Sequence, residues 1–294
     1  MTISLSWRIR VVTNLVLGAE GFVGKPLCKF LEEKRGEKVV SLDIKSNPDS
    51  DCRHAILNLD NIDRVYFLAW DVGGAKYLYR EDTQLQQLDW NLKLMLNVIP
   101  QIQAKGIPFL FISSQLAEEC DSVYGVTKRL GEVWAKLLNS VRVRLWNVYG
   151  PLERSSERSH VISDFVFQAL ETGEIRMLTT GDEKRQFIYI DDVCAAFHKA
   201  LSERLESVYD VASFEWIRVL DVANMIAKHT GAKVIPGTQY GVTPITRMRG
   251  KIPGWLPQVS LDEGIQRMVK EGRKLFEPCI NLFGKCTPPC TGKL

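Results

Sequence analysis

The chain has 294 residues, of which 45 % are hydrophobic, 25 % charged and 9 % aromatic, and its formal net charge is +3. This composition is typical of a soluble globular protein, and the interspersed charges form no basic stripe of the kind that binds nucleic acid. No apolar run approaches the roughly 18 residues of a membrane span, so we expect a cytoplasmic protein with neither a membrane nor a nucleic-acid partner.

The first predicted strand, VVTNLVL, runs directly into a glycine-rich turn. Gly18, Gly21 and Gly24 are spaced by three, and residues 22–34 then place apolar side chains at helical spacing. A helix N-terminus offers unpaired N–H groups and the positive end of the helix dipole, while glycine lets the backbone approach a diphosphate closely. The stretch fits a dinucleotide-binding turn, and a plain turn is the alternative at this point.

The second predicted strand, KVVSLDIKS, supports the dinucleotide interpretation. It carries Asp43, nineteen residues beyond Gly24, where a dinucleotide fold places the acid that binds a ribose 2′-hydroxyl. A carboxylate at this position repels the 2′-phosphate of NADP. We therefore expect NAD as the cofactor.

The chain then continues to alternate apolar strands with helical patterns. Strands are predicted at 64–70, 107–114 and 141–150, with helices between them at 83–105 and 126–139. Continuous apolar strands separated by helices are typical of a parallel sheet that is covered on both faces. The predicted fold class is α/β with a doubly wound parallel sheet.

A tyrosine and a lysine, Tyr124 and Lys128, lie one helical turn apart in YGVTK, so their side chains share one face of the predicted helix. An isolated tyrosine titrates at about pH 10. A neighbouring ammonium and a positively charged nicotinamide favour the phenolate, and together they would move Tyr124 toward the range of a general base. Ser114, at the end of the strand IPFLFISS, would hydrogen-bond to a substrate hydroxyl or to the tyrosine. Taken alone, the same spacing is more often an exposed helix with a stray tyrosine.

Further motifs follow in order along the chain: GAEGFVG, YFLAWDVGG, SS with YGVTK, RLWNVYGP, GDEKRQFIYIDDV and PGWLPQVSLDEGI. From about residue 11 to 272 the chain resembles the extended short-chain dehydrogenase/reductases, the NAD-dependent epimerase/dehydratase family that acts on nucleotide sugars. The resemblance implies an NAD-binding Rossmann domain at 1–150 and a smaller α/β substrate-binding C-terminal domain at 151–277, partly interleaved with the first. Residues 278–294 are predicted to form a loose tail.

The resemblance also implies roles for individual residues. Tyr124 would remove a sugar hydroxyl proton, Lys128 would hold the nicotinamide ribose and Ser114 would complete the catalytic set. The residues expected to bind the cofactor are Gly18, Gly21, Phe22, Val23, Gly24, Asp43, Leu68, Ala69, Trp70, Asn91, Tyr124, Lys128 and Trp146. Those expected to contact a nucleotide-sugar substrate are Ser114, Gln115, Asn147 and Arg185.

The expected reaction is 4-epimerisation of a nucleotide sugar, or oxidation or reduction at its C4, by hydride transfer. Dehydratases of the family carry Asp-Glu after the catalytic serine, whereas this chain has Gln115 and Leu116, which cannot exchange protons. Dehydration is therefore a disfavoured alternative. The stretch SHVI resembles the segment that carries the acid histidine of GDP-fucose synthases, so a 3,5-epimerase/4-reductase using His160 is another alternative, weighed evenly against a surface histidine.

An alternative of a different class is a non-catalytic NAD-sensing or RNA-binding scaffold. Three features depart from the family pattern. Only ten residues separate Ser114 from Tyr124, Trp70 replaces an alanine beside the cofactor, and residues 51–63 are too few for the usual helix. Because Tyr124 and Lys128 are both retained, an enzyme with a specialised substrate is favoured over a scaffold.

The family dimerises through two helices, which implies a homodimer through the helices near 84–103 and 124–139. No metal site is predicted. Asp191 and Asp192 have no third carboxylate nearby and fit a helix N-cap. Zinc ligands usually come in closely spaced pairs, unlike the three cysteines of the C-terminal stretch, Cys279, Cys286 and Cys290.

Overall fold

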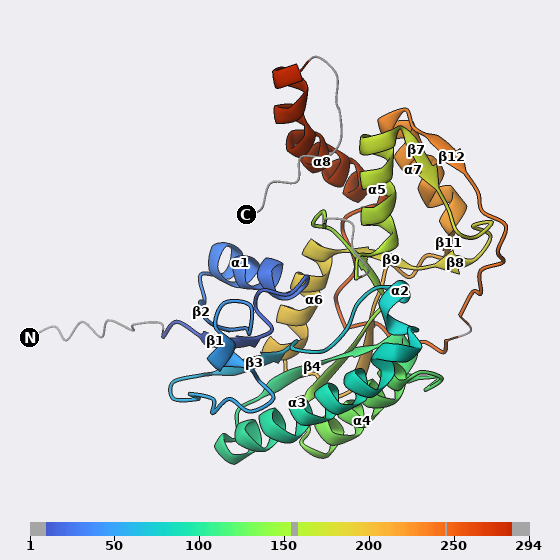
Figure 1. Cartoon of the computed structure of the whole chain (residues 1–294). Helices are drawn as coiled ribbons and strands as arrows, with labels where there is room; N and C mark the ends of the chain where they lie inside the picture. Colours follow the sequence, from blue (N-terminus) through green and yellow to red (C-terminus); the bar gives the residue numbers. More distant parts are fainter. Residues whose placement is uncertain (1–9, 154–157, 245, 284–294) are drawn as a thin grey trace, which may run out of the picture.

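The computed structural model describes residues 10–153, 158–244 and 246–283. Its centre is a parallel sheet of six strands: β1 (Thr13–Leu17), β2 (Lys38–Leu42), β3 (Arg64–Phe67), β4 (Phe109–Ser114), β5 (Val141–Leu145) and β10 (Val208–Val211). The strand order is β10-β5-β4-β3-β1-β2 (Figure 1). The order reverses between β1 and β3, and sheets of this kind bind ligands outside the carboxyl ends of the strands at that point.

Helices cover both faces of this sheet (Figure 1). On one face α1 (Gly24–Arg35) packs against α6 (Ile190–Ser202), and on the other α3 (Gln84–Lys105) packs against α4 (Val123–Leu137). Alternate strand residues enter different cores, so Val16 lies in the core of α1 and α6 while its neighbours lie in the core of α3. The predicted doubly wound α/β fold is confirmed.

The strand predicted at 141–150 is divided in the structure. β5 ends just before Trp146, after which β6 (Asn147–Tyr149) leaves the sheet and pairs with β9 (Phe187–Tyr189). At the break, the indole Nε1 of Trp146 donates a hydrogen bond to the buried carboxylate of Asp210 at 2.9 Å. This bond holds the chain where it passes from the sheet to the second lobe.

The second lobe is smaller and consists of helices and short sheets. In it α5 (Val161–Thr172), α7 (Val219–Thr230) and α8 (Leu261–Phe283) pack against one another. Its two-stranded sheets pair β7 (Glu174–Arg176) with β12 (Lys233–Ile235), and β8 (Lys184–Arg185) with β11 (Ile217–Arg218). The remaining short elements are η1 (Pro48–Ser50), α2 (Ala75–Leu78), η2 (Glu81–Thr83) and η3 (Gln115–Ala117).

The two lobes are interleaved, because α6 and β10 come from the second half of the chain and complete the first sheet. The helix α8 runs to Phe283, so it extends into the stretch predicted to be a loose tail. Cys286 and Cys290 lie outside the described residues. No helix in the described ranges is long and apolar enough to cross a membrane.

The predicted N-cap of α6 is wrong. Tyr189 is the N-cap residue, and both aspartates, Asp191 and Asp192, lie in the first turn of the helix. The carboxylate of Asp192 instead accepts hydrogen bonds from the backbone N–H groups of Gln258 and Val259, each at 2.9 Å. This aspartate therefore joins α6 to the segment that leads into α8, a contact between distant parts of the chain.

Candidate active site

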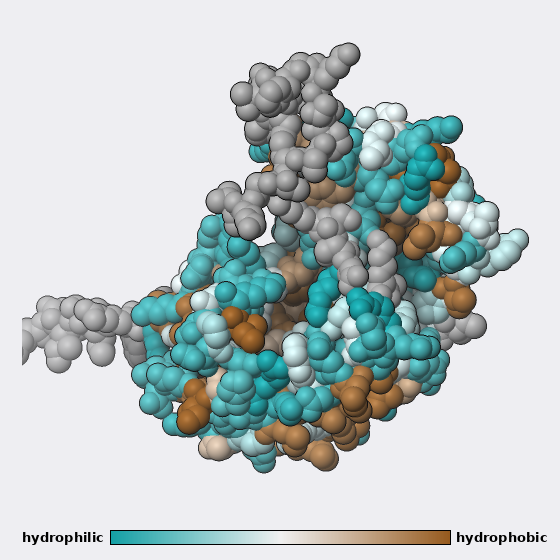
Figure 2. Space-filling view, in the orientation of Figure 1, coloured by the Kyte–Doolittle hydropathy of each residue, from teal (hydrophilic) through white to brown (hydrophobic). Residues whose placement is uncertain are grey.

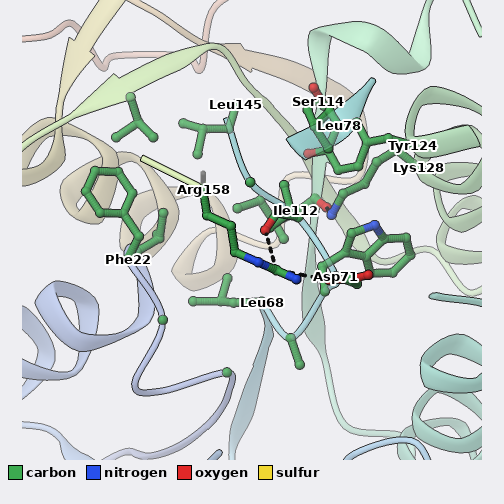
Figure 3. A pocket seen from close by; sticks show the side chains of 18 of the residues that line it. Phe22, Leu68, Asp71, Leu78, Ile112, Ser114, Tyr124, Lys128, Leu145 and Arg158 are labelled. Atoms are coloured by element: carbon green, nitrogen blue, oxygen red, sulfur yellow. Dashed lines mark hydrogen bonds and ion pairs between the residues drawn. The ribbon is translucent and has the colours of Figure 1, made fainter. Parts of the chain in front are cut away.

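A cavity of about 920 Å³ lies at the carboxyl ends of β1, β3 and β4, where the two lobes meet (Figure 3). It is lined by the glycine turn after β1, by the segments that follow β3 and β4, and by the second lobe. All of the predicted site residues line it except Asn91. The predicted site residues therefore lie in the cavity at the point where the strand order reverses.

The glycine turn has no room for side chains at two of its positions. Gly18 has φ +85°, and a Cβ there would lie 2.7 Å from the backbone nitrogen of Ala69. A Cβ at Gly24 would lie 2.0 Å from the carbonyl oxygen of Gly18, so this glycine permits close contact between α1 and the turn. At Gly21 the nearest atom to a Cβ is that same oxygen, at 3.1 Å. The turn therefore fits a diphosphate at the start of α1, with a bare backbone at Gly21.

The carboxylate of Asp43 lies at the end of β2 and is largely buried in the cavity wall. Its two oxygens accept hydrogen bonds from the backbone N–H groups of Glu20, at 2.9 Å, and Lys45, at 2.8 Å. These bonds fix the acid beside the glycine turn, in the position predicted for the ribose.

The wall of the cavity also contains residues that were not predicted. Asp51 and Arg53 follow η1 and line the cavity together with Trp90. Arg53 binds Asp51 through several side-chain hydrogen bonds, and its guanidinium carbon lies 4.0 Å from the ring centroid of Trp90. No pattern in the sequence indicated that the short segment 51–63 and a residue of α3 would come together here.

The side chains of Ser114 and Tyr124 meet across the end of β4 and the first turn of α4. The hydroxyl of Ser122 accepts a hydrogen bond from the backbone N–H of Gly125 at 3.1 Å and so begins α4 just before Tyr124. The Tyr124 ring packs against Tyr77 and Leu78. Burial raises the pKa of Tyr124 to about 12, although a hydrogen bond with the Ser114 side chain opposes the shift.

Lys128 is also buried, and its ammonium has contacts of its own besides the neighbouring tyrosine. Its Nζ donates a hydrogen bond to the carbonyl oxygen of Ile112 at 2.7 Å and lies 3.9 Å from the ring centroid of Trp70. Burial lowers the pKa of Lys128 well below its ordinary value, and the charge of Glu132 opposes this shift. The expectation that this lysine brings the Tyr124 pKa down is not met by the protein's own groups, because desolvation of the phenol dominates.

A buried network of charged side chains is connected to β4, the strand that ends at Ser114. Ser113 donates a hydrogen bond to Glu132 at 2.6 Å, and Glu132 accepts two hydrogen bonds from the fully buried Arg144. Arg144 also binds Glu118, which in turn pairs with Arg249 of the second lobe. The network therefore joins β4, α4, β5 and the short Ser114–Tyr124 segment.

The residues predicted to contact substrate come from both lobes: Ser114 and Gln115 follow one another at the end of β4, and Asn147 and Arg185 lie on the second-lobe side. Asn147 donates to the carbonyl oxygen of Gln186 at 3.2 Å, and Arg185 donates to that of Val242 at 2.8 Å. The side chain of Gln115 is 8 % exposed, and its Oε1 has no hydrogen-bond partner among the described residues. Its amide oxygen is therefore one of the lining groups that could accept a hydrogen bond from a ligand.

His160 lines the cavity on the side of the glycine turn. Its ring stacks on Phe22 with centroids 4.7 Å apart, and its Nδ1 lies 2.8 Å from an oxygen of Glu153. Figure 3 places Phe22 on the opposite side of the cavity from Tyr124. The structure therefore brings His160 into the site but not beside the Ser-Tyr-Lys set.

One arginine of the second lobe crosses the cavity (Figure 3). Arg158 pairs with Asp71 at 3.0 Å, and its guanidinium carbon lies 3.8 Å from the ring centroid of Tyr77. The Tyr77 hydroxyl donates to the same carboxylate. This pairing joins the segment after β3 to the second lobe, and no motif in the sequence indicated it.

Asn91 does not reach the cavity. Its Oδ1 accepts a hydrogen bond from the backbone N–H of Asp71 at 2.8 Å, and its Nδ2 donates to the carbonyl oxygen of Asp71 at 3.2 Å. Because both ends of the amide are used, the predicted direct contact with the cofactor is replaced by support of the segment after β3. No group of three or more potential metal ligands is present among the described residues.

A doubly wound sheet with this glycine turn, Asp43 and a Ser-Tyr-Lys set in one cavity defines a dinucleotide-binding enzyme of the short-chain dehydrogenase/reductase type. Residues 14–212 match the model of the NAD dependent epimerase/dehydratase family, and the chain belongs to this family of NAD-dependent enzymes.

Among curated proteins, the chain is 25 % identical to the dTDP-4-dehydro-6-deoxyglucose reductase of Escherichia coli, over 88 % of this chain and 97 % of that protein. Among solved structures, it is similar to UDP-glucose 4-epimerase from Thermotoga maritima, with a TM-score of 0.72, 22 % identity, and coverage of 90 % of this chain and 100 % of that one. The UDP-glucose 4-epimerase of Thermus thermophilus, solved in complex with NAD, gives a TM-score of 0.71 at 20 % identity, over 89 % of this chain and 99 % of that one. These similarities confirm the fold and the enzyme class.

Proposed function

We propose that the protein transfers a hydride at C4 of a nucleotide sugar, either to invert that centre or to reduce or oxidise it, with Tyr124 as the group that exchanges the hydroxyl proton. The observation that carries the proposal is the meeting of Ser114, Tyr124 and Lys128 in the cavity that contains the glycine turn. NAD, when bound, supplies the hydride acceptor or donor. Asp43 favours NAD over NADP because its carboxylate repels a 2′-phosphate.

The protein's own residues divide the remaining work. The Ser114 hydroxyl, which lines the cavity together with Tyr124, would hold the reacting sugar oxygen beside the phenol. Lys128 would present positive charge to the same region, which favours the phenolate form. Arg185 and Asn147 would bind the diphosphate and the sugar from the second-lobe side. Arg185 lies within the predicted substrate domain, 151–277, and Asn147 lies just before it.

The chemistry of two lining groups favours C4 transfer over dehydration. Gln115 and Leu116 follow Ser114, and neither an amide nor an alkyl group exchanges protons at neutral pH. All three relatives named above carry the position number 4 in their names. His160 stacks on Phe22 across the cavity from Tyr124, so a 3,5-epimerisation that uses it is the second candidate.

Proton NMR in D₂O tests the proposal. The purified protein with NAD or NADH is given UDP-, dTDP-, GDP- and CDP-hexoses in their 4-hydroxy and 4-keto forms. We expect inversion at C4, or reduction of a 4-keto group, without deuterium at other carbons. Deuterium at C3 or C5 that disappears in His160→Asn would establish the second candidate. No reaction with any sugar, despite bound NAD, would contradict the proposal and favour a non-catalytic role.

We also infer that two chains pair through α3 and α4. Apolar side chains gather on this face in Figure 2, and the exposed ones include Leu96, Val126, Leu130, Val133 and Leu137. Single exposed apolar residues are ordinary, but a contiguous row on neighbouring helices is typical of an interface. Light scattering after size-exclusion chromatography should give a dimer for the wild type and a monomer for the double variant Leu130→Glu/Val133→Glu. A wild-type monomer would contradict the inference.

A further inference from the structure

The ammonium of Lys128 is enclosed by groups from two neighbouring strands. Trp70 follows β3, and Ile112 lies in β4. Figure 3 labels Ile112 and Lys128 close to one another. Nζ lies 3.9 Å from the Trp70 ring centroid and 2.7 Å from the Ile112 carbonyl oxygen. The lysine is only 2 % exposed, so little water competes for its charge. An aromatic face is most attractive to a cation when both are desolvated.

The ring that makes this contact is itself fixed by packing. Trp70 meets Phe67 and Phe111 edge to face, with centroids 6.2 Å and 5.5 Å apart and interplanar angles of 65° and 76°. Its Nε1 is buried and has no hydrogen-bond partner among the described residues. Ring packing, and not a hydrogen bond at the indole nitrogen, therefore determines where the aromatic face lies.

The charged surroundings of Lys128 do not explain its position. Glu132, on the same helix, is the charge that acts on it, but this carboxylate is bound by Arg144 and Ser113. Tyr124 is the other titratable group nearby, and Nζ lies 5.7 Å from its ring centroid. The facing β4 residues are uncharged, and Asp71, next to Trp70 in the chain, is paired with Arg158 and Tyr77.

We propose that Trp70 is a positioning residue for Lys128: its indole face holds the ammonium against the Ile112 carbonyl and directs the remaining N–H toward the cavity. An ammonium has three N–H donors. One goes to Ile112, one points at the ring, and one is left for a ligand oxygen. A catalytic role for the third N–H of Lys128 rests on the proposed function. The contact between the Trp70 ring and the ammonium does not depend on that function.

Fluorinated tryptophans at position 70 test the contact without a change of shape. Fluorine withdraws charge from the ring face, so one, two and four fluorines weaken the attraction stepwise. The pKa of Lys128 is measured by NMR on protein with ¹³C-labelled lysine side chains, and its signal is assigned by its loss in Lys128→Met. We expect the pKa to fall stepwise by about one pH unit over the series. The same series at Trp146, which lines the cavity but binds Asp210, should leave it unchanged.

A pKa that stays constant across the position-70 series would overturn the proposal, and so would an equal response to fluorination of Trp146. Trp70→Phe should lower the pKa less than Trp70→Leu, because a benzene ring retains part of the attraction. In an active enzyme, the same variants should displace the pH profile of kcat in the order of the Lys128 pKa. If the pKa responds but no nucleotide sugar reacts, the proposed function fails while the positioning role stands.

Discussion

Replacing Gln115 by methionine should stabilise the free protein and weaken its binding of substrate. The amide oxygen of Gln115 is buried without a hydrogen-bond partner among the described residues. An unsatisfied buried polar atom costs about 1–3 kcal/mol, and methionine fills a similar space without it. We expect Gln115→Met to raise the free energy of unfolding by about 1 kcal/mol and Tm by about 2 °C.

The effect on binding should have the opposite sign. Gln115 is one of the residues predicted to contact substrate, and we expect a sugar hydroxyl to donate to its amide oxygen. Removal of that acceptor would leave the hydroxyl buried and unpaired. A loss of about 1–3 kcal/mol corresponds to roughly 10- to 100-fold weaker binding. Calorimetry with NAD-loaded protein and UDP-, dTDP-, GDP- or CDP-glucose, whichever binds best to the wild type, measures this loss.

Gln87 provides a matched control. It is fully buried and also has an unpaired Oε1, but its Nε2 donates to the hydroxyl of Thr83 at 2.9 Å and it does not line the cavity. Gln87→Met should therefore lower stability and leave the affinity of the folded protein unchanged. If Gln115→Met lowers stability to the same extent, the amide is structural and the reasoning is wrong.

Three further substitutions test the glycine turn, the buried charge network and the burial of the tyrosine. Gly18→Ala should abolish NAD binding in calorimetry because a Cβ there would lie 2.7 Å from a backbone nitrogen, whereas Gly36→Ala, also at positive φ but in open space, should keep it; equal losses would contradict this. Glu132→Gln should lower the free energy of urea unfolding by up to about 3–5 kcal/mol, since it removes the more buried of the two anionic partners of Arg144 and leaves only Glu118, and a change below about 1 kcal/mol would refute that role. Because the folded-state pKa of Tyr124 is about 12, above the ordinary 10.0, the stability of the wild type should fall relative to Tyr124→Phe as pH rises from 10 to about 12; parallel stability curves would show that the phenol is not desolvated.

The parts of the site that lie close together in sequence were predictable. The glycine turn, Asp43 and the Tyr124–Lys128 spacing each depend on one strand end or one helical turn, so local periodicity determines where these side chains go. The reversal of strand order then brings them to the same cavity, because parallel strands place their carboxyl ends along one edge of the sheet.

The contacts between distant segments could not be predicted from periodicity. Arg144 is an alternate residue of an apolar strand, and only the fold shows that it binds Glu132 and Glu118. Asn91 lies on the expected helix, yet its amide turns to the Asp71 backbone, which a residue type alone does not reveal. Such details depend on how two packed elements meet.

The same limit explains the tyrosine pKa. The spacing correctly placed Lys128 one helical turn from Tyr124. It contained no information on the burial of the two side chains, or on the Ile112 carbonyl oxygen that accepts a hydrogen bond from the ammonium. Desolvation therefore dominates the pKa of the phenol in the protein by itself. We expect the positively charged nicotinamide of bound NAD to add to the charge of Lys128 in favouring the phenolate form.

The most direct test of the central claim is the turnover of Tyr124→Phe with the nucleotide sugar that the wild type converts. We expect this variant to bind NAD and the sugar with nearly unchanged affinity, while turnover falls by about 10²–10⁴-fold because the proton-transfer group is lost. Turnover within a few-fold of the wild type, with binding intact, would show that Tyr124 does not move the proton and would contradict the proposed chemistry.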